Sequence, residues 1–215
     1  MQAAIVCASD MENLGAEMVN SDGTLQYYEE NAAGFTSNTI SADMEETRQR
    51  FLNLLPENAH ILDFGCGSGR DTKAFLESGY AVEAIDGSAE LCRIASEYTG
   101  IRVRQMLFQE LDAKNTYDGI WACSSILHLE KADLSEVLRR IAEALKPDGV
   151  LYTSFKYGTF EGVRKGRYFT DFTEESLNEF WKSFPSLKIV ETWITQDVRP
   201  GRGSERWINL LARRV

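Results

Sequence analysis

The sequence has few of the residues that build metal sites. Its 215 residues include four cysteines, which form no CxxC pair, and two histidines. Structural zinc sites take four such ligands at short spacings, so we expect no metal centre. Scattered cysteines without a disulfide framework also fit a reducing compartment, and we expect the protein to be cytoplasmic.

Positive charge is absent from the first 47 residues, which carry nine Asp and Glu. The rest of the chain has 24 acidic residues against 23 Lys and Arg, so the net charge of −10 belongs almost wholly to the N-terminal part. Binding to nucleic acid relies on a basic face that neutralises phosphates. The nearly neutral body of the chain therefore disfavours nucleic acid as a partner.

Long hydrophobic runs are also missing. The N-terminal run AAIVCA (3–8) is too short for a membrane span or a signal-peptide core, and no basic residue precedes it. We expect no membrane association and a monomer or weak dimer. We expect a mobile N-terminus at 1–20, cap helices within 21–56 and one α/β domain at 57–215.

From residue 60 onward, short apolar runs alternate with amphipathic segments. Such alternation predicts right-handed crossovers and a doubly wound, mostly parallel sheet of seven strands. The last two runs are separated by PGRGS and predict an antiparallel pair, so the last strand is antiparallel. The expected strands are 60–64, 80–86, 101–108, 117–125, 150–156, 187–195 and 206–214. The expected helices are 70–79, 88–100, 173–184 and one that ends in a turn within 132–149.

The glycine-rich stretch ILDFGCGSGRDT (61–72) follows the first of these strands. Ligands of such sheets bind where the strands end, so this turn is the candidate site. The dinucleotide fingerprint is GxGxxG, whereas this turn reads GxGxG and has Arg70 at the third glycine position. Asp63 precedes the turn and would repel a bound phosphate. These features disfavour a nicotinamide-dependent oxidoreductase and favour a ligand with a cationic or hydrogen-bond-donating group.

A second carboxylate, Asp86, ends the next strand, 21 residues after Gly65. An acid at this place accepts hydrogen bonds from the hydroxyls of an adenosine ribose. The alternative is that Asp86 only caps the helix that follows. Taken with the glycine turn, it predicts a nucleoside-binding site.

Four segments in order resemble the motifs of class I S-adenosylmethionine-dependent methyltransferases. They are ILDFGCGSGRDT, which has the form hhDxGxGxG, then AIDGS, YDGIWACSSILH and LKPDGVLYTSF. The resemblance covers roughly residues 45–156 and is greatest to small bacterial tellurite-resistance-type and other small-molecule methyltransferases. It implies a Rossmann-like fold, S-adenosylmethionine as cofactor and S-adenosylhomocysteine as product.

The resemblance also implies roles for residues of the domain. Asp63 would face the ammonium group of the cofactor, and Asp86 would hold its ribose. Relatives often have an acid where this chain has Leu107, so backbone groups or Gln109 would have to contact the adenine amine. The remaining implied cofactor contacts are Gly65, Cys66 and Gly67 at the methionine part, Gly87 and Ser88 at the ribose, Leu107 and Phe108 along the adenine and Cys123 near the methyl group.

The segment YYEENAAGF (27–35) resembles the cap helix of small methyltransferases. Tyr28 and Asn31 lie three residues apart and could both present polar groups to the cofactor. The alternative is that Tyr27 and Tyr28 only pack the cap onto the domain. Arg70 either pairs with the cofactor carboxylate or lies on the surface.

Methyl transfer from a sulfonium is an in-line displacement that needs alignment more than acid–base groups, so few catalytic residues are expected. His128 in SSILH is either a general base or a packing residue. Two segments rich in positive charge, 156–167 and 199–206, would favour an anionic acceptor if they reach the cleft and are otherwise solvated loops. The candidate acceptor-binding residues are Tyr157, Arg167, Tyr168 and Arg199, with Asp171 in the same region.

We therefore expect methyl transfer to a small molecule through an oxygen, nitrogen, sulfur or metalloid nucleophile. The segment CSSI lacks the Asn/Asp-Pro-Pro-aromatic run expected of enzymes that methylate nucleic-acid bases. A cofactor-binding protein without catalysis is the main alternative, because so few side chains are obligatory for the reaction.

Overall fold

The computed structural model describes residues 19–199 and 201–215. Most of the N-terminus that we predict to be mobile, 1–20, lies outside these residues. Two helices occupy the region expected to form a cap: α2 (Val19–Thr39) and α3 (Glu45–Leu52). Among the described residues, no helix is long and apolar enough to cross a membrane.

A seven-stranded sheet forms the centre of the molecule, with the order β3-β2-β1-β4-β5-β9-β8. All neighbouring pairs are parallel except those with β9, which runs antiparallel to both β5 and β8. The predicted fold is therefore confirmed. The strands are β1 (His60–Phe64), β2 (Ala81–Asp86), β3 (Arg104–Gln105), β4 (Tyr117–Ala122), β5 (Leu145–Lys156), β8 (Leu187–Gln196) and β9 (Arg206–Arg214).

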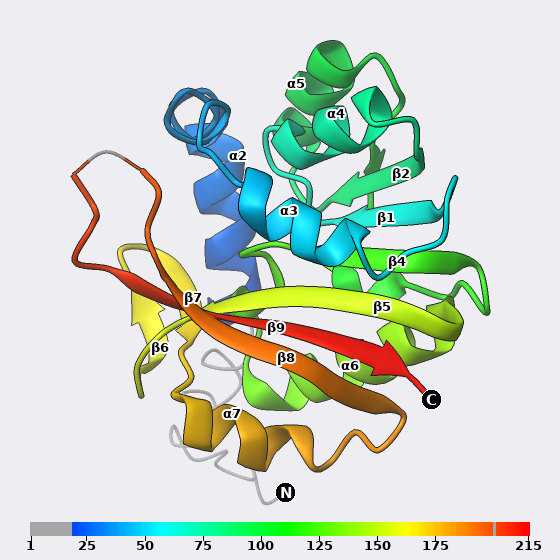
Figure 1. Cartoon of the computed structure of the whole chain (residues 1–215). Helices are drawn as coiled ribbons and strands as arrows, with labels where there is room; N and C mark the ends of the chain where they lie inside the picture. The colour runs from blue at the N-terminus through cyan, green and yellow to red at the C-terminus, as the bar shows by residue number, and fades with distance from the viewer. Residues whose placement is uncertain (1–18, 200) are drawn as a thin grey trace, which may run out of the picture.

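Helices cover both faces of the sheet (Figure 1) because both sets of alternating strand side chains are apolar. On one face Ile61 packs with Phe51 of α3 and Phe75 of α4. On the other face Leu62 and Phe64 belong to the cluster that includes residues of α6 and α7. The remaining helices are α4 (Arg70–Glu77), α5 (Ala89–Thr99), α6 (Lys131–Ala144) and α7 (Glu174–Trp181).

The strand predicted at 101–108 is wrong over most of its length. Only Arg104 and Gln105 pair with β2, and Phe108–Glu110 form a 3₁₀ turn, η1. The backbone N–H of Leu107 donates to the Glu110 carboxylate at 2.8 Å instead of to a neighbouring strand. The Glu110 side chain thus accepts a hydrogen bond that a neighbouring strand would accept if β3 continued.

The basic segment 156–167 is not simply a loop. It contains β6 (Glu161–Arg164), which pairs with β7 (Arg167–Thr170) in an antiparallel hairpin outside the main sheet. Lys165 and Gly166 form the two-residue connection, and both have positive φ, as primed hairpin turns require.

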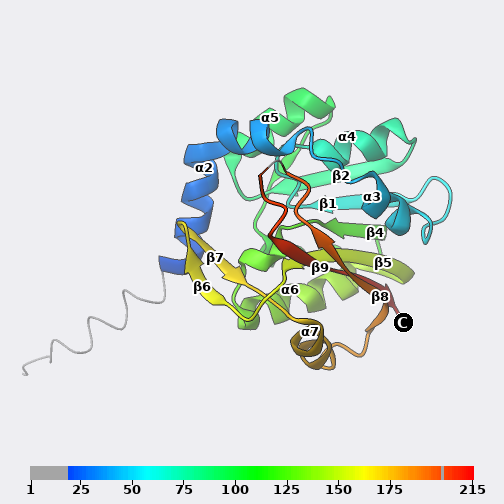
Figure 2. The ribbon, with the colours of Figure 1, turned by 60° about the vertical axis from the view of Figure 1, so that its left-hand side comes forward.

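Helix α2 lies across the carboxyl ends of the parallel strands, at the left of Figure 1. On one side its Thr24 hydroxyl accepts a hydrogen bond from the backbone of Tyr168 in β7, at 3.0 Å. On the other side Ser88, at the start of α5, donates to Glu29 at 2.6 Å. Figure 2 shows α2 between α5 and the β6–β7 hairpin. The helix and the hairpin therefore enclose the end of the sheet where ligands bind.

Candidate functional site

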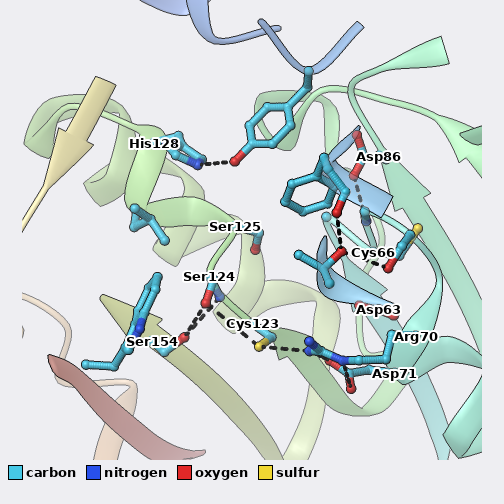
Figure 3. A pocket seen from close by; sticks show the side chains of 18 of the residues that line it. Asp63, Cys66, Arg70, Asp71, Asp86, Cys123, Ser124, Ser125, His128 and Ser154 are labelled. Atoms are coloured by element: carbon cyan, nitrogen blue, oxygen red, sulfur yellow. Dashed lines mark hydrogen bonds and ion pairs between the residues drawn. The ribbon is translucent and has the colours of Figure 1, made fainter. Parts of the chain in front are cut away.

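A cavity of about 530 Å³ lies under α2, at the carboxyl ends of β1, β2 and β4. Its volume is within the range of about 300–1,000 Å³ that small-molecule sites occupy. Figure 3 shows Asp86, Cys66 and Asp63 along one wall and His128 across the cavity from them. The two carboxylates predicted to bind one ligand therefore line the same cavity.

The glycine turn brings backbone close to the cavity because its residues have conformations that side chains disfavour. Gly65 and Gly67 have φ values of 85° and 55°. A Cβ atom at Gly65 would lie 2.5 Å from Cβ of Ser125, and one at Gly67 would lie 2.9 Å from the Phe35 ring. Glycine is therefore required at both positions so that the turn can pack against Ser125 and Phe35.

We expect Gly65→Ala to lower the free energy of unfolding by about 2–3 kcal/mol, because positive φ and overpacking both oppose alanine. Gly79→Ala is the matched control, since Gly79 has φ 87° but no atom within 4 Å of a Cβ. Its expected loss is about 1 kcal/mol. Urea denaturation of both variants measures the difference, and equal losses would show that the contact with Ser125 has no effect.

Asp86 holds the glycine turn and also faces the cavity. Its carboxylate accepts hydrogen bonds from the backbone N–H groups of Gly67 and Ser88, each at 2.9 Å. Burial raises the pKa of Asp86, although these N–H groups oppose the shift. The helix cap of α5 is Ser88, whose hydroxyl accepts from the Leu91 N–H. Asp86 is therefore not the helix cap, and it retains acceptor capacity toward the cavity.

Asp63 is a buried carboxyl group with one hydrogen-bond partner from a side chain. Thr72 donates to it at 2.5 Å, and only 2% of Asp63 is exposed. Burial, with a smaller effect of Asp71, raises its pKa to about 7. A cationic group in the cavity would stabilise its ionised form.

Arg70 does not lie on the surface, because it belongs to a buried ion network. Its Nε and Nη2 donate to the two oxygens of Asp71 at 3.0 and 2.6 Å. Asp71 also accepts from Arg48 of α3 and from the indole of Trp121, each at 2.9 Å. Burial opposes ionisation of Asp71, but the arginines outweigh it and hold the pKa below its usual value. This network joins α3, α4 and β4 and fixes Arg70 at the cavity wall.

The network was not predicted from the sequence. The sequence signal for this network was Asp71, a carboxylate that lies within the glycine motif just after the turn. Arg48 and Trp121 lie 23 and 50 residues away from it in the chain, and no local pattern relates them.

A cluster of Tyr28, His128 and Arg167 forms another part of the wall. His128 Nδ1 lies 2.6 Å from the backbone oxygen of Tyr168, so this nitrogen carries the proton. Burial lowers the His128 pKa to about 4, and the neutral ring accepts from the Tyr28 hydroxyl through Nε2 at 2.8 Å. Arg167 Nη1 donates to the same hydroxyl at 3.2 Å. The hydroxyl proton of Tyr28 is thus directed at His128.

The end of the cavity near β2 and β3 is lined by less polar groups. Met106, Leu107, Phe108 and Gln109 lie there, and Leu107 is 41% exposed. Gly87 is needed for the approach of α2, because a Cβ at that position would lie 2.5 Å from Leu25. The predicted adenine contacts Leu107 and Phe108 therefore lie close to Gln109, the residue predicted to replace the missing acid.

The opposite end of the cavity is polar and charged, and both predicted basic segments contribute to it. Its lining residues include Lys156, Arg167, Asp197, Arg199, Arg202, Trp207 and Asn209. Arg199 forms an ion pair with the buried Asp197, and Lys156 pairs with Glu205. Cys123 lies between the two ends, 3.7 Å from Arg70, and burial raises its pKa to about 11.

Four predicted site residues do not line this cavity. Asn31 is exposed and donates to the backbone of Tyr27 at 2.8 Å, because the inward face of α2 carries Thr24, Tyr28 and Phe35 instead. Ser88 is used as the cap of α5. The other two are Tyr157, whose ring stacks with Arg206, and Tyr168, whose hydroxyl donates to Glu161.

Asp171 likewise has a structural partner. It accepts two hydrogen bonds from Arg164 in β6, at 2.9 and 3.0 Å. The described residues contain no group of three or more His, Cys, Asp or Glu side chains placed to hold a metal ion.

Comparison with known proteins finds similarity over most of the chain. Residues 61–149 match the family described as a methyltransferase domain. A methyltransferase of Staphylococcus carnosus is 25% identical over 71% of this chain and 81% of its own length. A ubiquinone biosynthesis O-methyltransferase of Caulobacter vibrioides is 30% identical over 67% of this chain, but the match spans only 51% of that protein.

Among solved structures, 1,6-didemethyltoxoflavin-N1-methyltransferase of Burkholderia thailandensis is similar over the whole chain. The match has a TM-score of 0.71 and 25% identity, and it covers 100% of this chain and 93% of the other. That structure contains 1,6-didemethyltoxoflavin and S-adenosylhomocysteine. The expected likeness to small-molecule methyltransferases is confirmed by this neighbour.

Proposed function

Because this chain belongs to the class I S-adenosylmethionine-dependent methyltransferases, we propose that it methylates a small molecule. The observation that carries the proposal is a single cavity with two different ends. One end has the glycine turn, Asp63 and Asp86, and the other has Lys156 and Arg199. A cofactor and a second small ligand can therefore occupy adjoining parts of one cavity.

The residues present fit S-adenosylmethionine. Asp86 has free acceptor capacity for ribose hydroxyls, and the glycine turn lines the cavity beside it. Arg70 and Asp63 offer opposite charges to a carboxylate and an ammonium group. When bound, S-adenosylmethionine supplies a methyl group attached to a positively charged sulfur. Transfer of the methyl group leaves that sulfur in a neutral thioether.

The protein's contribution to the reaction is alignment and exclusion of water. Helix α2 and the β6–β7 hairpin enclose the cavity, and Asp71 fixes Arg70 through two hydrogen bonds. His128 was predicted to be a candidate base. Its low pKa and its bond to Tyr28 favour a different role, in which it orients the Tyr28 hydroxyl.

The raised pKa of Asp63 predicts that cofactor binding depends on pH. The free protein holds this carboxyl with a pKa of about 7, and the cofactor ammonium needs the ionised form. Below that pH the ligand must expel a proton, so affinity falls as pH falls. We expect the Kd for S-adenosylhomocysteine to rise roughly 25-fold between about pH 7.5 and about pH 5.5.

Calorimetric titration across this range measures the effect, and Asp63→Asn is the control. This variant retains an amide oxygen but has no titrating proton, so its Kd should be weaker and nearly independent of pH. An equally steep pH dependence in the variant would assign the titration to another group.

Turnover separates an enzyme from a binding protein. The protein is incubated with S-adenosylmethionine and a panel of phenols, thiols, carboxylates and aromatic nitrogen heterocycles, and formation of S-adenosylhomocysteine is measured. We expect acceptor-dependent product, and much less of it with Asp86→Ala at the same cofactor concentration. Tight cofactor binding with no turnover for any acceptor would support the alternative of a binding protein without catalysis.

A further inference from the structure

Arg167 differs from the other cations that line the cavity. Among the side chains that the structure describes, those of residues 23–199 and 201–215, its guanidinium has no carboxylate partner, whereas Arg70 pairs with Asp71 and Arg199 with Asp197. Its Nε–H is buried without a hydrogen-bond partner in the same part of the chain. Native proteins rarely leave a buried donor unpaired, and no described carboxylate balances the positive charge of this guanidinium at the cavity wall.

Aromatic rings hold Arg167 in place instead of a counter-charge. Its guanidinium lies 4.4 Å from the centre of the Tyr27 ring and 5.2 Å from that of Phe169. Such stacking fixes the orientation of the planar group while leaving its charge uncompensated. A rigid, unpaired guanidinium is suited to binding an anion.

Within the described part of the chain, the titratable groups around Arg167 are already engaged. The Nδ1 proton of His128 is committed to the Tyr168 backbone, and Nε2 accepts from Tyr28. Asp197 is neutralised by Arg199. Asp63 and Asp86 lie in the part of the cavity assigned to the cofactor. A protonated nucleophile would therefore find no group at this end ready to remove its proton.

We propose that the acceptor is a small acidic nucleophile that binds as its anion, with the charged region against Arg167. This inference rests on the proposed methyltransferase function and specifies its acceptor. The anion contributes the electron pair for the new bond to the methyl carbon, and the bond from that carbon to sulfur breaks. A neutral methylated product and neutral S-adenosylhomocysteine result, and no proton is transferred in the step.

The test uses two planar probes of matched size, 4-nitrophenol and 4-nitroaniline, at a mildly alkaline pH. The first is then an anion and the second is neutral. Calorimetry measures the binding of each to the full-length protein saturated with S-adenosylhomocysteine. We expect the nitrophenolate to bind at least about tenfold more tightly than the nitroaniline, as a charge-assisted contact implies.

Two variants assign the difference to Arg167. Arg167→Gln should abolish the preference for the anion. Lys165→Gln is the matched control, because it removes one positive charge from an exposed residue of the same hairpin that does not line the cavity, and it should retain the preference. Circular dichroism of each variant establishes that it is folded.

The outcomes distinguish this inference from the proposed function. Equal binding of the two probes, no binding of nitrophenolate, or an unchanged preference in folded Arg167→Gln would overturn the assignment of an anionic acceptor. If the wild-type protein failed to bind S-adenosylhomocysteine at all, the proposed function itself would be contradicted.

Discussion

Replacing Asp71 with alanine is expected to lower the free energy of unfolding by about 3–5 kcal/mol. The substitution leaves the guanidinium groups of Arg48 and Arg70 without their shared partner in a buried position, where their side chains are 12% and 18% exposed. It also removes the acceptor of the Trp121 indole N–H. Uncompensated charge in the interior is costly because the protein cannot replace the hydration that water would provide. Urea denaturation measures the loss.

Glu45→Ala is the matched control for this prediction. Glu45 accepts from the same Arg48 at 2.9 Å, but its side chain is 72% exposed. Exposed ion pairs contribute little, so the expected change is within about 0.5 kcal/mol. If Asp71→Ala lost no more than Glu45→Ala, the network would not be the element that holds α3 to the domain.

The second large effect concerns Asp86. We expect Asp86→Ala to weaken binding of S-adenosylhomocysteine on the order of 100-fold, because hydrogen bonds to a charged group contribute about 1.5–3 kcal/mol each. Part of the loss will come from the turn, since the carboxylate also accepts from the N–H of Gly67. Asp86→Asn retains an acceptor oxygen and should show an intermediate loss. Calorimetry on folded protein gives each Kd.

Asp118→Ala provides a control that also removes a carboxylate from the end of a strand. Asp118 accepts from the His60 backbone and from Lys146, each at 2.8 Å, and it does not line the cavity. Its loss should leave the affinity for S-adenosylhomocysteine unchanged. Unaltered affinity in Asp86→Ala as well would refute the ribose-binding role.

The sequence was most informative where structure depends on local pattern. The strands at 60–64 and 206–214 were predicted with their observed ends, because apolar runs between turn residues admit few alternatives. Helix α5 was predicted with its cap Ser88 and its terminating Gly100, which has φ 79°. The glycine turn and the carboxylates of Asp63 and Asp86 were predicted because each lies at a strand end.

Features that depend on distant residues were not predictable in this way. The Arg48–Asp71–Trp121 network needs the packing of three elements. Asn31 was assigned to the site from its spacing to Tyr28, but only the fold shows which side of α2 faces the cavity. Lys165 and Gly166 were a weak sequence signal for the turn of the β6–β7 hairpin. The positive charge of the segment drew the interpretation toward a loop instead.

We infer that the glycine turn, Asp63 and Asp86 bind S-adenosylmethionine. Calorimetric titration with S-adenosylhomocysteine, run in parallel with NAD⁺, tests it most directly, because both ligands contain an adenosine and only NAD⁺ places a diphosphate at the turn. We predict that S-adenosylhomocysteine binds at one site per chain and that NAD⁺ does not bind. Binding of NAD⁺ alone would overturn this assignment and would mean that Asp63 tolerates a phosphate beside it.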